Sequence, residues 1–396
     1  MVKRRDVLRG MALAAAGCGV GVAPLFAQGP GDQSAGPTLT PVEGLPEVRV
    51  SEAINHVLAP IRDRHHLPGL IGGLVHGDRL ESVGVVGIRK VGSPALFQVG
   101  DQIHLGSDTK AMTATMIGSL VDEGKLGWAA TVEEVFPDQA KKLHPDFRAV
   151  TLWQLLTHRA GLPANGPWWM LKQNQSTTEQ RRVLMAGMLQ SAPLTKPGTK
   201  FAYSNVGYAV AGLMAEQVTG QSWETLMRQR LFEPLGMKAG GFGPPGTKGK
   251  VDQPWGHQAE GETFTPRQED NAPALGPAGT VHCTLADWAR FAGLHLRAAQ
   301  GKPRLLKQET FRTLQTPPPG SEYAGGWLVV ERPWAGGRAL THSGSNTMWY
   351  ATLWVAPQRD LAILTATNAG GDPASDACNE AVEALVNLSQ IAPDRE

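Results

Sequence analysis

Hydrophobic residues recur along the chain with two different periods, and the changes of period divide the chain into three parts. In the first part, apolar residues at helical spacing follow Ser51, and two apolar runs at 70–75 and 80–86 flank a Gly77-Asp78 turn. A serine before an amphipathic stripe predicts a helix, and short apolar runs around a Gly-Asp turn predict two paired strands. The patterned region therefore begins with a helix and a β-hairpin.

The middle part has helical periodicity. Met112, Met116 and Leu120 lie on one face of a predicted helix that ends at Gly124. Residues 238–280 are rich in Gly and Pro, which predicts an irregular segment. Further helices are expected after Thr151, over 206–218, after Ser222 and after Thr284.

The third part returns to strands. Apolar runs at 326–331, 350–355 and 361–367 predict three strands, and Asp372 followed by Pro373 predicts the start of a final helix. Strands at both ends of the chain around a helical middle predict an α+β fold, in which one antiparallel sheet is built from both chain ends and an all-helical lobe is inserted. A ligand-binding cleft is expected where the two lobes meet.

We assign the patterned region to a single domain over 47–396. Its sheet lobe is expected at about 47–103 and 325–396, and its helical lobe at about 104–324. The boundary between the lobes therefore falls just before the Met112 helix and just before the C-terminal strands.

The residues before this domain have the composition of an export signal and a linker. Residues 1–27 join a basic head to a short apolar run, which predicts a signal peptide, and the Arg4-Arg5 pair resembles a twin-arginine signal. Cys18 leaves lipid anchoring open, and 28–46 is expected to be a disordered linker. The protein is therefore expected in the periplasm or outside the cell, with no integral membrane span after signal removal.

Composition and charge exclude several classes of partner. The 396 residues carry 37 Lys and Arg against 36 Asp and Glu, so a nucleic-acid partner is not expected. No histidine spacing predicts a metal site, and no metal or organic cofactor is expected. Beyond Cys18, the two cysteines Cys283 and Cys378 are either a disulfide pair or two buried thiols.

Candidate chemistry begins with Ser107 and Lys110. Three residues apart at a helix start, their side chains share one face, so a neutral lysine amine could take the serine proton. The backbone N–H groups at a helix N-terminus favour developing negative charge, which suits a serine nucleophile. An N-cap serine beside a solvated lysine remains the structural alternative for this segment.

Two further segments carry polar groups of the same kind. Tyr203 and Asn205 precede a helix, and a phenol beside a lysine ammonium would have a lowered pKa, which suits a general base. His342, Ser343 and Gly344 lie at a late strand. For the first segment, the alternative is a turn whose Asn205 caps the next helix. For the second, the alternative is that His342 is a structural histidine.

These three segments, in the order S-x-x-K, Y-x-N and H-S-G, resemble the motifs of the serine β-lactamase and penicillin-binding-protein-like superfamily, in its class C β-lactamase, D,D-peptidase and esterase branch. The resemblance covers about 48–390. It also includes Leu155-Leu-Thr-His-Arg-Ala-Gly-Leu-Pro163, Gly276-Pro-Ala-Gly-Thr-Val-His-Cys-Thr-Leu-Ala-Asp-Trp-Ala-Arg-Phe291 and Thr365-Ala-Thr-Asn368. It implies a three-layer α/β/α fold of the β-lactamase/transpeptidase type.

The resemblance also implies a role for each motif residue. Ser107 would be the acylated nucleophile, Lys110 its base or proton relay, and Tyr203 the partner base for the leaving group and for water. Asn205 would position substrate and lysine, and His342 would be a further donor or proton relay. The backbone N–H groups of Ser107 and Ser345 would form the oxyanion hole, and Ser343, Gly344 and Asn346 would line the substrate site.

One departure from the motif bears on the substrate. Many β-lactamases have a lysine where this chain has His342, and a histidine is mostly neutral near pH 7, so recognition of a carboxylate is expected to be weaker. The leading prediction is an exported serine hydrolase acting as an esterase, peptidase or amidase on a small acyl or D-amino-acid substrate. A β-lactamase or D,D-carboxypeptidase is the alternative enzyme, and a catalytically silent penicillin-binding-like sensor the alternative of another class.

Overall fold

A seven-stranded sheet forms the centre of the protein. The computed structural model describes residues 49–391 except 262, so the predictions for the signal peptide, Cys18 and the linker lie outside the described residues. The strand order is β1-β3-β2-β12-β11-β10-β9. The strands are β1 (Arg49–Val50), β2 (Gly69–His76), β3 (Arg79–Gly87), β9 (Leu328–Arg332), β10 (Gly337–Ser345), β11 (Tyr350–Ala356) and β12 (Leu361–Thr367).

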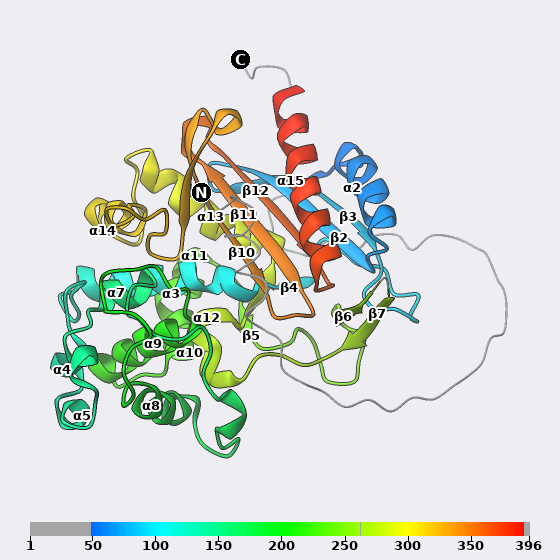
Figure 1. Cartoon of the computed structure of the whole chain (residues 1–396). Helices are drawn as coiled ribbons and strands as arrows, with labels where there is room; N and C mark the ends of the chain where they lie inside the picture. The colour runs from blue at the N-terminus through cyan, green and yellow to red at the C-terminus, as the bar shows by residue number, and fades with distance from the viewer. Residues whose placement is uncertain (1–48, 262, 392–396) are drawn as a thin grey trace.

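Both ends of the chain build this sheet, as predicted. β2 pairs antiparallel with β12, with Leu70 opposite Thr367 and His76 opposite Leu361, so the first hairpin joins directly to the last strand (Figure 1). The described part of the chain therefore has an α+β fold whose N-terminal and C-terminal segments share one sheet.

The sheet is buried on both faces, which explains why β2 reads as a continuous apolar run. Leu70 and Leu74 belong to one hydrophobic cluster, and Ile71 and Val75 belong to the other. Successive side chains of a strand point to opposite faces, so a strand covered on both sides favours apolar residues along its whole length. Each fully buried leucine or isoleucine stabilises the fold by about 1.5–3 kcal/mol.

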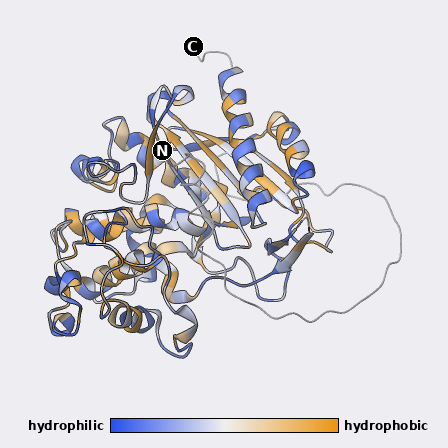
Figure 2. Ribbon diagram, viewed as in Figure 1, coloured by the Kyte–Doolittle hydropathy of each residue, from blue (hydrophilic) through white to orange (hydrophobic). Residues whose placement is uncertain are grey.

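Helices cover the two faces in three layers. α2 (Glu52–Arg64) and α15 (Asp372–Ile391) pack on one face, and α13 (Leu285–Ala299) packs against β2, β3, β11 and β12 on the other. Figure 2 shows α2 and α15 carrying both polar and apolar colours, as expected of helices with one face on a core. α13 lies within the residues assigned to the helical lobe, yet its apolar face covers the sheet.

The remaining helices gather beside the sheet, around the central helix α3 (Figure 1). They are α3 (Thr109–Asp122), α4 (Val132–Val135), α5 (Pro137–Ala140), α6 (Pro145–Arg148), α7 (Leu152–Leu156), α8 (Thr177–Met188), α9 (Asn205–Thr219), α10 (Trp223–Met227), α11 (Glu233–Leu235), α12 (Gly276–Gly279) and α14 (Gln308–Leu314). Every residue of α3 from Thr109 to Leu120 is buried, so this helix is enclosed on all sides.

The segment predicted to be irregular contains short ordered elements. β4 (Gln102–His104), β8 (Val281–Thr284) and β5 (Gly241–Phe242) form a three-stranded sheet, and β6 (Gly256–Glu260) pairs with β7 (Thr263–Arg267). β8 pairs with strands distant in the chain, which local Gly and Pro content could not predict, whereas β6 and β7 form a local hairpin.

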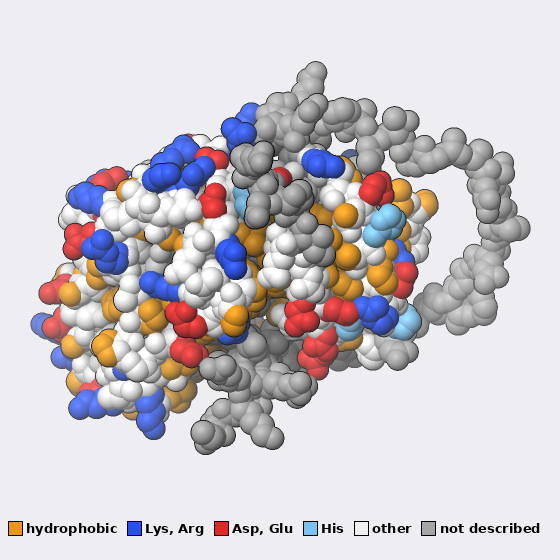
Figure 3. Space-filling view, turned by 90° about the horizontal axis from the view of Figure 1, so that it is seen from above, with side chains coloured by type: hydrophobic (Ala, Val, Ile, Leu, Met, Phe, Trp, Pro, Cys, Tyr) orange, Lys and Arg blue, Asp and Glu red, His pale blue; other side chains and the backbone are white. Residues whose placement is uncertain are grey.

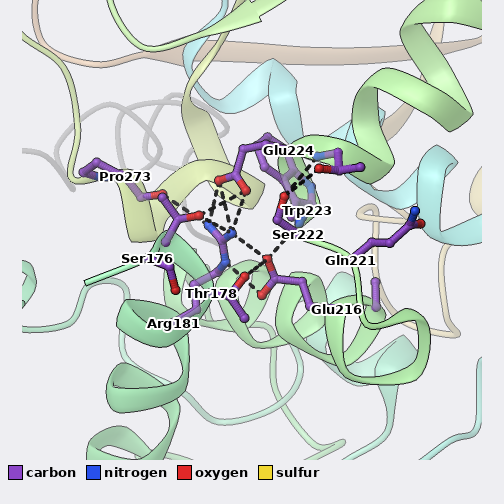
Figure 4. Close-up of polar contacts among 12 residues, drawn as sticks. Ser176, Thr178, Arg181, Glu216, Gln221, Ser222, Trp223, Glu224 and Pro273 are labelled. Atoms are coloured by element: carbon purple, nitrogen blue, oxygen red, sulfur yellow. Dashed lines mark hydrogen bonds and ion pairs between the residues drawn. The ribbon is translucent and has the colours of Figure 1, made fainter. Parts of the chain in front are cut away.

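A buried ion-pair cluster fastens the helical part together. The guanidinium of Arg181 on α8 donates to both carboxylate oxygens of Glu216 on α9, at 3.2 and 2.6 Å, and to Glu224 on α10 (Figure 4). Arg181 also donates to the Pro273 carbonyl at 3.3 Å. One side chain therefore connects three helices to the segment that follows β7.

The two cysteines are buried free thiols on opposite sides of the sheet. Cys283 belongs to the cluster under α13, and Cys378 belongs to the cluster under α15. Of the alternatives left open by the sequence, the structure therefore has the unpaired one.

The outer surface of the molecule is mixed in charge. Figure 3 shows basic and acidic side chains interspersed on one face. Within residues 49–391, no helix is both long enough and apolar enough to cross a bilayer.

The Arg181 cluster makes a stability prediction. Glu216→Gln should lower the free energy of unfolding by about 3 kcal/mol, because it leaves a buried guanidinium short of one anionic partner. Arg182→Gln, on the neighbouring and partly exposed residue, should change it by less than about 0.5 kcal/mol. Urea unfolding followed by circular dichroism measures both, and equal midpoints for the two variants would contradict the prediction.

Candidate active site

Ser107 lies in the turn that leads from the small sheet into α3. β4 ends at His104, a 3₁₀ turn follows over Gly106–Asp108, and α3 begins at Thr109. The hydroxyl therefore stands at the N-terminal end of a fully buried helix, as the sequence predicts.

Two glycines allow this turn to touch the end of strand β10. Gly106 has φ +51°, and a Cβ atom added there would lie 2.4 Å from the Ser345 nitrogen. A Cβ atom on Gly344 would lie 2.4 Å from the Ser107 nitrogen. No other residue fits either position, so glycine at both is what brings the Ser107 and Ser345 backbones together.

Lys110 is enclosed one helical turn beyond Ser107. Its Nζ donates to Ser107 Oγ at 3.0 Å and to the Ala278 carbonyl at 2.6 Å, and the side chain is fully buried. Burial lowers the pKa of the Lys110 ammonium well below its usual range, against the opposing effect of the nearby Asp108. The amine is therefore available as a base.

Asp108 lies buried beside this lysine. Its carboxyl is buried, and neither oxygen has a hydrogen-bond partner among the described residues. Burial raises the pKa of the Asp108 carboxyl well above its usual range. Burial therefore favours the neutral forms of both the Asp108 carboxyl and the Lys110 amine.

Tyr203 completes the contacts of the serine hydroxyl. Its phenol donates to Ser107 Oγ at 2.9 Å. The sequence-based expectation of a lowered pKa is wrong, because burial raises the pKa of the Tyr203 phenol above its ordinary value. The lysine beside it is desolvated and does not supply the positive charge that would stabilise a phenolate. Tyr203 therefore stands as a proton donor.

Aromatic rings surround the lysine and the phenol. Lys110 Nζ lies 4.9 Å from the ring centroid of Tyr203 and 5.5 Å from that of Tyr208. Tyr323 belongs to the same aromatic group, because the His158 ring lies 4.3 Å from the Tyr203 ring and 4.6 Å from the Tyr323 ring. Three of the four tyrosines in the chain therefore meet at one place. This apolar wall explains the strong desolvation of Lys110.

His158 holds Tyr203 in position. Its ring lies 4.3 Å from the Tyr203 ring, and its Nδ1 accepts from the Ser204 backbone N–H at 3.0 Å. The His158 carbonyl also accepts from the Ala202 N–H at 2.7 Å. Burial lowers the pKa of His158 well below its usual range, so its ring is neutral.

Asn205 is the first residue of α9 and lies beside another asparagine. Its Nδ2 donates to Asn165 Oδ1 at 2.9 Å, while Lys110 Nζ has Ser107 and Ala278 as its hydrogen-bond partners. Its predicted role toward lysine and substrate therefore remains a proposal.

His342 lies inside strand β10 and is neutral. Its Nδ1 donates to the Ser343 carbonyl at 2.9 Å, so its Nε2 accepts from the Tyr323 phenol at 2.9 Å. Burial lowers the pKa of His342 to about 3. The ring therefore anchors Tyr323 and presents no positive charge.

The end of β10 packs against the Ser107 turn. β9 pairs with β10 only up to Thr341, and beyond that residue the turn lies on the face of β10 at Gly344. The backbone nitrogens of Ser107 and Ser345 both lie at this contact, and their predicted role as an oxyanion hole remains a proposal.

The side chains of Ser343 and Asn346, which were predicted to line the substrate site, contact other protein groups. Ser343 Oγ is 2.8 Å from Thr352 Oγ1 on β11, whose side chain lies on the α15 side of the sheet. Asn346 is buried and donates to Asp270 Oδ1 at 2.9 Å. These two side chains are engaged within the protein, while Gly344 lies against the Ser107 turn.

Several residues of the site had no role in the sequence analysis. His158 and Ala278 belong to stretches that were recognised only as typical of a superfamily, and Tyr208 and Tyr323 carried no motif. The rarity of tyrosine was the one signal that could have found the last two. Ala278 acts through its carbonyl, so its residue type carries no such signal.

Comparisons with known proteins agree with this geometry. The model of the family described as Beta-lactamase matches residues 54–387. Penicillin-binding protein 4 of Amycolatopsis lactamdurans is 28% identical over 327 residues, which is 78% of this chain and 83% of that protein. Unguisins hydrolase ungD' of Aspergillus campestris is 24% identical over 77% of this chain, but this chain spans only 59% of its length.

Solved structures show the same fold. The octameric penicillin-binding protein homologue from Pyrococcus abyssi superposes with a TM-score of 0.69 at 23% identity, covering 84% of this chain and 77% of that one. The D-alanine carboxypeptidase AmpC from Burkholderia cenocepacia gives 0.67 at 21% identity, covering 84% and 98%. The family match over 54–387, on a fold of this type, shows that the chain belongs to the Beta-lactamase family.

Proposed function

We propose that the protein is an exported serine hydrolase that forms an acyl-enzyme on Ser107 and releases it with water. The observation that carries this proposal is the placement of Ser107 Oγ between Lys110 Nζ, at 3.0 Å, and Tyr203 Oη, at 2.9 Å. A hydroxyl in contact with a neutral amine and a phenol has both a base and an acid within reach. Export rests on the N-terminal sequence.

The proposed acylation follows from these contacts. Lys110 Nζ takes the proton of the Ser107 hydroxyl as Oγ attacks the substrate carbonyl. The negative charge that develops on the carbonyl oxygen is stabilised by the N–H groups of Ser107 and Ser345. Tyr203 gives its proton to the leaving group and regains one from Lys110. Water then attacks the acyl-enzyme, and the same groups carry its proton to Ser107 Oγ.

General principles set the scale of each contribution. A positioned acid or base accelerates such a reaction by about 10²–10⁴-fold. One oxyanion donor contributes about 2.7–4 kcal/mol to the transition state. Loss of Lys110, Tyr203 or the backbone donors should therefore be visible against any background hydrolysis.

The substrate is proposed to be an uncharged ester, amide or peptide bond, on a small acyl or D-amino-acid group. His342 is neutral and occupied by Tyr323, so it supplies no charge for a carboxylate. Phe201, which is 41% exposed, lies 5.7 Å from the ring of Tyr323 and 5.6 Å from that of His158, which adds an apolar surface beside the site. Such a surface favours apolar groups on the substrate.

A β-lactamase or D,D-carboxypeptidase is the alternative function. The observation that favours it is the similarity to proteins named as a penicillin-binding protein and a D-alanine carboxypeptidase. A silent penicillin-binding-like sensor is a further alternative, and the complete contacts of Ser107 argue against it.

Removal of the nucleophile tests the central claim. Ser107→Ala should abolish hydrolysis of p-nitrophenyl acetate and butyrate, measured by release of p-nitrophenol, because no acyl-enzyme can form. Ser119→Ala is the matched control, since Ser119 lies about three turns further along α3 and bonds to the Met116 carbonyl. Turnover by Ser107→Ala at the wild-type rate would refute the proposal.

The state of Lys110 predicts the pH dependence. Its neutral amine is the active form, so kcat/KM should rise with pH through the lowered pKa of Lys110 and reach a plateau below the ordinary lysine range. Because the pKa of Tyr203 is raised, no descending limb is expected near neutral pH.

Two variants separate these groups in the pH–rate profile. Lys110→Arg, which stays charged, should lose about 10²–10⁴-fold at all pH values. Tyr203→Phe should lose a similar factor in kcat but keep the ascending limb. An ascending limb centred near pH 10 in the wild type would contradict the assignment of Lys110 as a neutral base.

Substrate preference is tested by the adducts of Ser107. Mass spectrometry of the intact protein after exposure to small esters, D-amino-acid peptides and penicillins should show fast acylation and release with uncharged esters. Carboxylate-bearing penicillins should acylate slowly. Rapid turnover of nitrocefin would favour the β-lactamase alternative, and an ester adduct that never deacylates would favour the sensor.

A further inference from the structure

A buried polar network lies directly behind the Ser107 turn, and the proposed reaction does not use it. The network joins His104 at the end of β4, Asp270 in the segment after β7, and Asn346 just beyond β10. His104 is fully buried, Asn346 is 2% exposed, and the Asp270 side chain is 5% exposed. Buried polar groups are nearly always hydrogen-bonded, and a network whose members are all satisfied makes the surrounding structure rigid.

His104 links the network to the Ser107 turn. The Gly106 N–H donates to His104 Nδ1 at 3.1 Å, and His104 Nε2 lies 2.8 Å from Asp270 Oδ2. Because Nδ1 accepts, the ring proton must be on Nε2, where it is donated to Asp270. The tautomer of His104 is therefore set by its two partners.

Asn346 links the same carboxylate to the end of β10. Its Nδ2 donates to Asp270 Oδ1 at 2.9 Å, and its Oδ1 accepts from the Met348 N–H at 3.2 Å. Asp270 Oδ1 also accepts from the Asn271 N–H at 2.7 Å. Each carboxylate oxygen of Asp270 thus receives donors from a different part of the chain.

The two arms of the network end next to the two proposed oxyanion donors. Gly106 immediately precedes Ser107, and Asn346 immediately follows Ser345. The Ser107 turn and the end of β10 come from segments more than 200 residues apart, and Asp270 connects their neighbours through hydrogen bonds alone. Hydrogen-bonded groups behind a site commonly orient the groups that act in it.

The segment around Asp270 is itself anchored. Asn271 Nδ2 donates to the Gly279 carbonyl at 3.0 Å, and Arg181 donates to the Pro273 carbonyl at 3.3 Å. The Ala278 carbonyl, which accepts from Lys110, lies in the same stretch. These hydrogen bonds fix the segment that carries Asp270, so its carboxylate can hold the Ser107 turn and the end of β10 in place.

We infer that Asp270, with His104 and Asn346, is a positioning group that holds the Ser107 and Ser345 N–H groups at the spacing an oxyanion hole needs. It touches neither substrate nor the reacting atoms. The expected loss of kcat rests on the proposed function. The expected change in the position of the Ser107 and Ser345 backbone rests on the hydrogen bonds alone.

Asparagine at position 270 is the informative substitution. An aspartate accepts from both His104 Nε2–H and Asn346 Nδ2–H, whereas an asparagine has one acceptor oxygen and an NH₂ group that would face a donor. Asp270→Asn therefore breaks one arm of the network at nearly constant volume. Glu269→Gln, on the exposed neighbouring residue, removes a carboxylate of the same kind and is the matched control.

The first measurement does not depend on activity. In protein labelled with ¹⁵N-serine, Asp270→Asn should shift the backbone amide resonances of both Ser107 and Ser345, and Glu269→Gln should shift neither. The side-chain ¹⁵N spectrum of the wild type should show His104 protonated on Nε2 only. Unmoved serine amides in Asp270→Asn, or a His104 proton on Nδ1, would overturn the inference.

The second measurement separates positioning from general stability. Asp270→Asn should lower kcat for p-nitrophenyl butyrate about 10–100-fold with KM changed less than about twofold. The carbonyl stretch of its acyl-enzyme should move to higher frequency, because the hydrogen bonds to the acyl oxygen weaken. Wild-type kcat and carbonyl frequency in a folded Asp270→Asn protein would also overturn the inference.

A second variant keeps the test decisive if Asp270→Asn does not fold. Asn346→Ala removes the arm to β10 and should shift the Ser345 amide and give the same split between kcat and KM. An inactive wild type with shifted amides in the variants would refute the proposed function and leave the network assignment standing. An active wild type with unaffected variants would refute the network assignment alone.

Discussion

The site depends on one constraint, the removal of the Lys110 amine from water. A lysine in solvent is a cation and cannot accept a proton, whereas this one is enclosed by helix α3, by tyrosine rings and by the Ala278 carbonyl. Burying a charge costs free energy, so this environment favours the neutral amine. Its basicity, the protonated state of Tyr203 and the neutrality of His342 all follow from the same desolvation.

That constraint requires close packing between distant segments. The helical part supplies the aromatic wall, the stretch after β7 supplies the lysine's acceptor, and the sheet supplies the strand that faces the serine. The Arg181 cluster and the Asp270 network are both attached to the stretch after β7, so the two main polar connections of the interior meet there. Geometry at the serine therefore depends on residues well outside the motifs.

The sequence predicted most of the regular elements and the residues in contact at the serine. Continuous apolar runs identified β2, β11 and β12, and capping residues such as Ser51 and Thr284 marked helix starts. For strand β10 the sequence placed His342 to Gly344 at a late strand but did not predict its bounds, because Thr341 to Ser345 is polar and glycine-containing although it lies within the sheet. The pKa of Tyr203 was predicted in the wrong direction because the burial of the phenol itself cannot be read from a motif. The partners of Asn205 and Asp270 depend on tertiary contacts and were equally out of reach.

The free stretch at the end of β10 has a consequence for the behaviour of the protein in concentrated solution. An unpaired strand edge is a template for pairing with other chains, and proteins commonly protect such edges. Here the Ser107 turn lies against the part of β10 that β9 leaves uncovered, with glycines on both sides of the contact. Because a Cβ atom at Gly344 would point into the turn, the turn covers one face of β10 and not its edge, and no strand of the described residues pairs with that edge beyond Thr341. This short edge is therefore the place where a second chain could add a strand to the sheet.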